Sequence, residues 1–124
     1  MPEKAINTFE DLEAWQVSHR FILEIYRITK EFPKDELYGL VSQLCRAALS
    51  ITSNIAEGFS RYHYNDKICF YYNARGSVSE VKNCLIVSKD LKYIKKEGCQ
   101  ILLGDAERML RLINGLIRSI GKQK

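Results

Sequence analysis

The stretch that decides the fold of this chain reads LVSQLCRAALSITSNIAEGFSR, from Leu40 to Arg61. Its apolar residues recur at helical spacing, while its other positions are mostly small and polar, and none of them is Lys. A helix on the protein surface needs only one apolar stripe for packing, and any solvated residue can occupy its other positions. The specific polar residues therefore predict a helix that is also packed along its polar line, which consists of Arg46, Ser50, Ser53, Asn54, Glu57 and Arg61.

The whole chain has the composition of an ordinary globular protein. Its 124 residues are 46% hydrophobic and 27% charged, which predicts a single domain over residues 1–124 with a sizeable core. No stretch approaches the roughly 18 apolar residues of a membrane span, so we expect no membrane segment. The N-terminal residues are acidic where a signal peptide would be basic and then apolar, so we do not expect secretion.

The hydrophobic pattern predicts an all-α fold with helices over residues 9–32, 36–62, 65–93 and 99–120. Thr8 followed by Asp11 is a helix-start signal, and Pro33 ends the first helix. A turn is expected at His63–Asp66 and a break at Lys95–Gly98. Because these connections are short, the prediction is an antiparallel, up-down-up-down four-helix bundle.

The first and last helices carry more apolar surface than one seam requires. In the last helix Leu102, Ala106, Met109, Ile113, Leu116 and Ile120 follow the spacing of a left-handed bundle, and Leu103, Leu110 and Ile117 recur beside them. In the first helix one stripe contains Leu12, Trp15, His19, Ile22 and Tyr26, and a second contains Phe21, Ile25, Ile28 and Phe32. A wide core would explain these stripes, but their presence on two helices favours a homo-oligomer.

The third helix has a polar row of its own, which can pair with the polar line of the second. If the two helices are antiparallel about residue 63, facing residue numbers sum to about 126. Arg46 then faces Glu80, Ser50 faces Gly76–Ser77 and Asn54 faces Tyr72–Asn73, and the small residues Gly and Ser would let the two backbones approach closely. We therefore predict an Arg46–Glu80 ion pair backed by a ladder of Ser and Asn. The expected structural network consists of Arg46, Ser50, Asn54, Glu57, Asn73, Ser77 and Glu80. The alternative is a catalytic pocket using Arg46, Glu57 and Glu80, which no nucleophile–base pairing supports.

Motifs for catalysis, cofactors and metals are missing. A di-iron bundle needs two Glu-x-x-His motifs, but the two histidines, His19 and His63, follow Gln16 and Ser60 at that spacing. No phosphate-binding loop or nucleophile elbow is present. The four cysteines form no CxxC pair and are expected as buried, reduced thiols. We expect His19 to be a hydrogen-bonded core residue and His63 an exposed turn residue, and we expect no enzymatic activity and no cofactor.

Positive charge gathers in the second half of the chain. Residues 1–62 hold 7 Lys and Arg against 9 Asp and Glu, whereas residues 63–124 hold 12 against 6. On the last helix four basic residues lie on the side opposite the apolar seam; we call Arg108, Arg111, Arg118 and Lys122 the basic ridge. Arg61 and Lys67 flank the predicted turn with Tyr62 and Tyr64 between them. These six basic residues are candidates for nucleic-acid binding, and the alternative is an ordinary solvated surface.

Several segments resemble a known family: FEDLEAWQ (residues 9–16), FPKDELYGL (32–40), SQLCRAALSITSNIAEG (42–58) and ARGSVSE (74–80). They are similar to the four-helix bundle family of 23S rRNA intervening-sequence proteins, also described as ribosomal-protein-like. The resemblance covers roughly residues 9–93, and the last helix matches only in pattern.

The resemblance implies a bacterial, cytoplasmic bundle that assembles as a homo-oligomer, a pentamer in this family. It also implies a distant similarity to the accessory protein of diversity-generating retroelements, a pentameric bundle with a basic surface that binds a reverse transcriptase and nucleic acid. No catalytic residues carry over. The expected function is a non-enzymatic oligomer that binds RNA or a nucleic-acid-handling protein and no membrane. The alternative is a protein-interaction scaffold without a nucleic-acid role.

Overall fold

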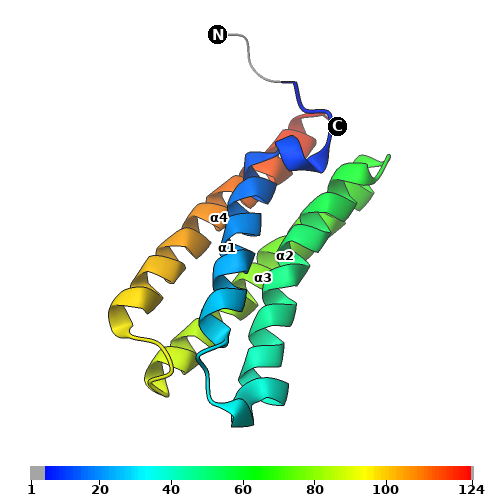
Figure 1. Ribbon diagram of the computed structural model, residues 1–124. Helices are drawn as coiled ribbons and strands as arrows, with labels where there is room; N and C mark the ends of the chain where they lie inside the picture. The colour runs from blue at the N-terminus through cyan, green and yellow to red at the C-terminus, as the bar shows by residue number, and fades with distance from the viewer. Residues whose placement is uncertain (1–4, 124) are drawn as a thin grey trace.

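Four long helices make up most of the molecule. The computed structural model describes residues 5–123, and its helices are α1 (Glu13–Thr29), α2 (Ser42–Ser60), α3 (Tyr64–Asp90) and α4 (Lys96–Gln123). They run alternately up and down, and α2 and α3 form one long hairpin (Figure 1). No strand occurs within these residues. The all-α four-helix prediction is confirmed.

A short 3-10 turn, η1 (Phe9–Asp11), precedes α1. The carboxylate of Asp11 accepts hydrogen bonds from the backbone N–H groups of Asn7 (2.9 Å) and Thr8 (3.0 Å), as the helix-start signal predicted. Leu12 is extended, with φ −75° and ψ 127°, so the predicted first helix is divided there and α1 proper begins at Glu13.

The connection from α1 to α2 is more structured than the sequence indicated. After Pro33 come a 3-10 turn, η2 (Lys34–Glu36), and a π-helical turn, η3 (Leu37–Val41), which is kinked at Gly39. The carboxylate of Glu36 accepts hydrogen bonds from the backbone N–H of Leu40 (3.4 Å) and from the hydroxyl of Tyr93 (3.0 Å). Glu36 therefore ties this connection to the α3–α4 connection at the same end of the bundle.

The break between the third and fourth helices lies earlier in the chain than the predicted Lys95–Gly98. Helix α3 ends at Asp90, and Lys92 adopts a left-handed φ of 66°, which reverses the chain direction. Helix α4 begins at Lys96, so Gly98 lies inside its first turn. The Asn114–Gly115 pair does not interrupt α4, and the side chain of Asn114 accepts a hydrogen bond from Arg75 (3.1 Å) on α3.

The core runs along the axis of the bundle and confirms the predicted seam of α4. Its members Leu102, Ala106, Met109, Ile113 and Ile120 are buried, while Leu116 is half-buried. The second α4 stripe (Leu103, Leu110, Ile117) packs against the same core, so on this helix the wide-core interpretation holds.

Two sequence expectations about single side chains, those for His19 and Cys69, are wrong. His19 is exposed and stacks on Trp15, with ring centroids 4.6 Å apart and planes 10° apart, because it lies on the outward side of α1. Tyr26, expected on the same apolar stripe, is 44% exposed. Cys69 is exposed on α3, whereas Cys84 and Cys99 are buried as expected; all four cysteines are free thiols. His63 is exposed in the turn, as predicted.

A membrane-spanning role finds no support in the helices. Among the residues described, each helix is too short or too polar to cross a bilayer.

Candidate nucleic-acid interface

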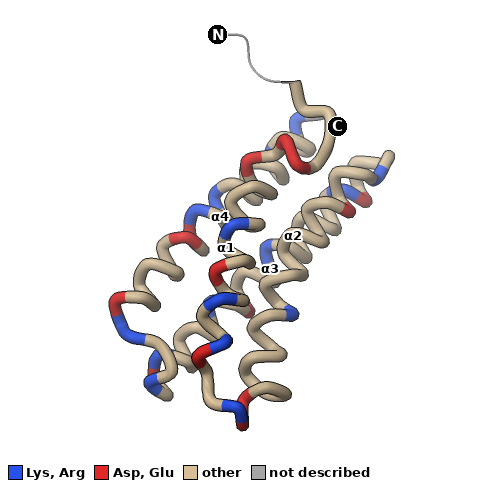
Figure 2. Tube along the Cα trace, in the orientation of Figure 1, with Lys and Arg blue, Asp and Glu red and all other residues tan. Residues whose placement is uncertain are grey.

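The basic ridge lies on the outward face of α4. Burial of the Met109 and Ile113 seam sets the rotation of the helix, so the opposite side faces solvent. All four ridge residues are exposed. Figure 2 shows basic segments along the C-terminal half of α4, with acidic segments near the start of α1 at the same end of the bundle.

One ridge residue has an acidic partner on α1. Arg108 Nη2 lies 2.9 Å from Glu13 Oε1, and both side chains are about half exposed or more. An exposed pair of this kind contributes roughly 0–1 kcal/mol to stability, but it offsets one positive charge of the ridge. Within residues 5–123, no ion pair forms at Arg111, Arg118 or Lys122. These three residues keep their full charge toward solvent.

The two basic residues at the α2–α3 turn each have a partner within the protein: Arg61 pairs at the surface, and Lys67 is partly buried. The guanidinium of Arg61 binds the carboxylate of Glu57 (2.6 Å) and lies 4.7 Å from the centre of the Phe70 ring. Lys67 Nζ donates to the carbonyl oxygen of Phe59 (2.7 Å), at the end of α2. Desolvation by burial lowers the pKa of Lys67. Both side chains therefore stabilise the turn more than they offer charge to a ligand.

The α2–α3 seam joins the two polar rows at the predicted register. Ser77 Oγ donates to Ser50 Oγ at 2.9 Å, and Asn54 Nδ2 donates to Ser50 Oγ (3.0 Å) and to the Ser50 carbonyl (2.8 Å). The pairing of Ser50 with Ser77 is confirmed. Asn73 is exposed on α3, and Asn54 bonds within its own helix instead of reaching it.

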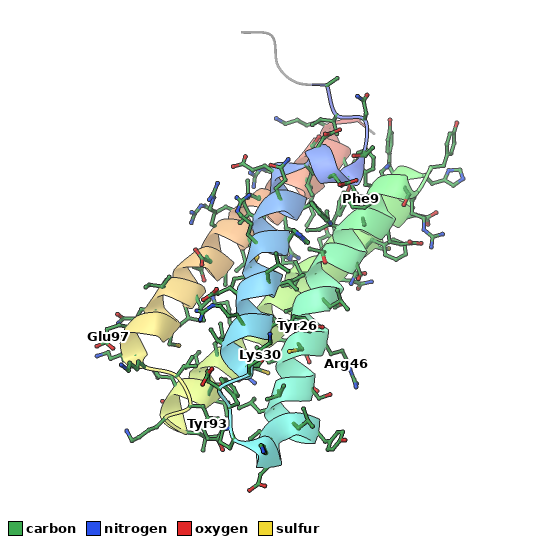
Figure 3. All side chains as sticks on the ribbon, viewed as in Figure 1. Phe9, Tyr26, Lys30, Arg46, Tyr93 and Glu97 are labelled. Atoms are coloured by element: carbon green, nitrogen blue, oxygen red, sulfur yellow. The ribbon has the colours of Figure 1, made fainter. Side chains whose placement is uncertain are left out.

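The predicted Arg46–Glu80 ion pair does not form. Glu80 accepts a hydrogen bond from the side chain of Gln43 instead. At 100° per residue, Arg46 lies about 60° further around α2 from the core than Gln43 does, so its side chain faces solvent. Figure 3 shows Arg46 extending away from the bundle. Gln43 could have been found from the sequence, because it lies seven residues before Ser50 on the same line of the helix.

Close packing of α2 on α3 occurs at Gly58, whereas Gly76 is exposed. A Cβ atom on Gly58 would lie 2.8 Å from Tyr71 Cε1 and 3.0 Å from Phe70 Cβ. A Cβ atom on Gly76 would meet nothing within 4 Å. The seam is therefore a packed contact, and the catalytic pocket considered for Arg46, Glu57 and Glu80 is not assembled, because Arg46 faces solvent and Glu57 binds Arg61.

A separate groove of about 740 Å³ lies where the first half of α4 faces the end of α1. Its apolar lining includes Ile28, Ile94 and Ile101, and charged side chains surround it. No group of three His, Cys, Asp or Glu side chains suited to a metal ion occurs in the described part of the chain.

Comparisons with known proteins agree with this architecture. The sequence model of the family described as 23S rRNA-intervening sequence protein matches residues 10–115. No curated protein matches the chain. A crystal structure from Bacteroides thetaiotaomicron, described as a protein with unknown function from the S23 ribosomal protein family, is similar with a TM-score of 0.79. The similarity covers 85% of this chain and 95% of that chain at 21% identity, which demonstrates a shared fold.

Proposed function

The chain belongs to the 23S rRNA-intervening sequence protein family, and on this basis we propose that it is a non-enzymatic helical bundle that self-associates and binds RNA. The proposed RNA surface is the basic ridge of α4. Arg61 and Lys67 take a secondary place, because their charged groups already have partners in the same chain: the Glu57 carboxylate for Arg61 and the Phe59 carbonyl for Lys67.

The observation that carries the RNA proposal is the unneutralised charge of the ridge. Arg111, Arg118 and Lys122 are exposed, and no Asp or Glu occurs between Arg108 and Lys122. The three charges follow one face of a regular helix over about three turns. Lys and Arg that contact phosphates release condensed counterions, which gives affinity without base specificity.

The test is RNA binding measured against salt for a charge-reversal variant. Arg111→Glu, Arg118→Glu and Lys122→Glu combined should weaken binding strongly and lower the slope of log K against log[salt] by about 2 for single-stranded RNA. The matched control is Lys92→Glu, Lys95→Glu and Lys96→Glu, which makes the same change in net charge at exposed positions of the α3–α4 connection and the first residue of α4. Equal losses of RNA affinity in both variants would mean that net charge alone determines binding. That result would contradict the ridge as the binding surface.

Self-association is supported by apolar side chains that the bundle leaves uncovered on α1 and α2. Leu23 is 58% exposed, Tyr26 44% and Leu49 49%. A second copy of the chain that covered this apolar surface would stabilise the assembly by roughly 25 cal/mol for each Å² removed from water. The pentameric number rests on the family resemblance alone.

Light scattering tests the self-association. We expect a mass five times that of the chain for the wild type and a lower mass for Leu23→Glu/Leu49→Glu. Ile101→Glu, which changes a 68% exposed residue on α4, should keep the wild-type mass. A wild-type monomer would contradict the assembly. An oligomer that binds no RNA at low salt would instead support the scaffold function.

A further inference from the structure

The α2–α3 turn presents aromatic rings to solvent at the end of the bundle where α4 also ends (Figure 1). Tyr62 is 88% exposed, and Tyr64 is 40% exposed. The rings of His63 and Tyr62 are perpendicular, with centroids 5.1 Å apart and planes at 89°. Because Tyr62 is almost fully exposed, its ring remains open to a flat partner despite this contact.

Several contacts fix the backbone of the turn that carries these rings. Only residues 61–63 separate α2 from α3. The backbone N–H of Arg61 donates to the Gly58 carbonyl (3.3 Å), and the N–H of Lys67 donates to the His63 carbonyl (3.1 Å). Lys67 Nζ also donates to the Phe59 carbonyl at 2.7 Å. A ring presented on a preorganised turn loses little conformational entropy when a ligand covers it.

The charged groups at the turn already have partners within the protein, so the turn is better suited to stacking on a base than to binding phosphate. Arg61 is paired with Glu57, and the amine of Lys67 caps α2. The exposed charges of Arg118 and Lys122 belong to the last turns of α4, at the same end of the bundle. A basic surface that follows the backbone, combined with aromatic rings that stack on bases, is the usual composition of a single-strand binding site.

We propose that Tyr62, in contact with His63, stacks on an unpaired nucleobase of RNA held by the basic ridge. The inference rests on the proposed RNA binding and adds a preference for unpaired over duplex RNA. Bases in a duplex are stacked on one another and are not available to a protruding ring, whereas unpaired bases can be splayed out. Loss of one such stacking contact lowers affinity by roughly five- to a hundredfold.

The experiment measures fluorescence anisotropy with two probes at one salt concentration: a fluorescein-labelled 12-mer of uridine and a labelled 12-base-pair RNA duplex. Tyr62→Ala should weaken binding of the single strand at least about fivefold and change duplex binding by less than twofold. Tyr62→Phe should retain single-strand binding, because the ring face remains. Tyr38→Ala is the matched control: Tyr38 is 93% exposed at the opposite end of the bundle, and its removal should change neither affinity.

The outcomes separate this inference from the proposed function. If Tyr62→Ala leaves single-strand binding unchanged, or weakens both probes equally, the stacking proposal is overturned, while loss of binding in the ridge variant still supports the ridge. If Tyr62→Ala changes the mass measured by light scattering, the ring belongs to a subunit contact and the proposal is overturned. If the wild type binds neither probe at low salt, the proposed RNA function fails and the stacking proposal fails with it.

Discussion

Ser77 donates a hydrogen bond to Ser50 across the α2–α3 seam at 2.9 Å, and Asn54 donates to the same Ser50 oxygen. The two helices that carry the family-like sequence are thus joined at their centre by small hydroxyl groups. Because the side chains are short, the seam has one register in which they meet. The polar line of α2 is in this respect a structural feature, and the exposed basic surface lies on α4.

Ser50→Ala should lower the free energy of unfolding by about 1 kcal/mol, because Ser77 and Asn54 both lose a hydrogen-bond acceptor. Ser77→Ala should lower the free energy of unfolding by a similar amount. The double variant should lower it by less than the sum of the two single losses. Urea denaturation of all three proteins measures this coupling. Ser53→Ala, at an exposed position of α2, should change nothing. Strictly additive losses would mean that the two hydroxyls do not interact.

Gly58→Ala should destabilise the protein by roughly 1–3 kcal/mol although alanine favours helices, because the new methyl group would lie 2.8 Å from the Tyr71 ring. Gly76→Ala is the control on the neighbouring helix. Its methyl group meets nothing within 4 Å, so it should stabilise α3 by about 0.5–1 kcal/mol. Thermal or urea unfolding distinguishes the opposite signs, and a stabilising Gly58→Ala would contradict the close packing.

Arg46→Ala should leave stability within about 0.5 kcal/mol of the wild type, because Arg46 is exposed and Glu80 is bound by Gln43. An ion pair buried in the seam would instead cost roughly 3–5 kcal/mol on losing one partner. Urea unfolding of this single variant discriminates between the two arrangements. A loss in the larger range would show that Arg46 forms the pair with Glu80 after all.

Stability should fall between about pH 10 and pH 12 in a way that depends on Tyr71. Burial raises the pKa of Tyr71 to about 12, whereas an unfolded tyrosine titrates near 10. In this range the unfolded chain loses the proton and the native protein keeps it, so the free energy of unfolding decreases as pH rises. Urea unfolding at pH 9 and pH 11 should show a smaller decrease for Tyr71→Phe than for the wild type. Tyr72→Phe, at an exposed position, should behave as the wild type does.

The thiols should react with a disulfide reagent such as DTNB at different rates. Cys69 is exposed and should react first. Burial raises the pKa of both Cys84 and Cys99, which lowers their thiolate fraction as well as their access to the reagent. Absorbance at neutral pH should therefore show one fast phase that Cys69→Ser removes. A fast phase that persists in Cys69→Ser would indicate that one of the other thiols is accessible.

Much of the fold could be predicted from local patterns. The 3.6-residue period predicted four helices, and the Thr8–Asp11 signal and Pro33 marked the ends of the first. The sum of 126 placed Ser50 opposite Gly76–Ser77, and Ser77 is the residue that it meets. Each of these depends on interactions between residues close in sequence or on the geometry of one short turn. The boundaries were less accurate where the backbone leaves ideal geometry, at Leu12, Gly39 and Lys92.

The sequence by itself therefore determined the helices, their order and the register of one seam, because helical periodicity is a local property of the chain. Only the tertiary structure decided the rotation of each helix against its neighbours. That rotation turned Arg46 and His19 outward, brought Gln43 to Glu80, and placed the amine of Lys67 against the end of α2. A rotation of some tens of degrees leaves the apolar pattern unchanged but exchanges the side chains at the edge of a packed face, and these are the residues on which a candidate site depends.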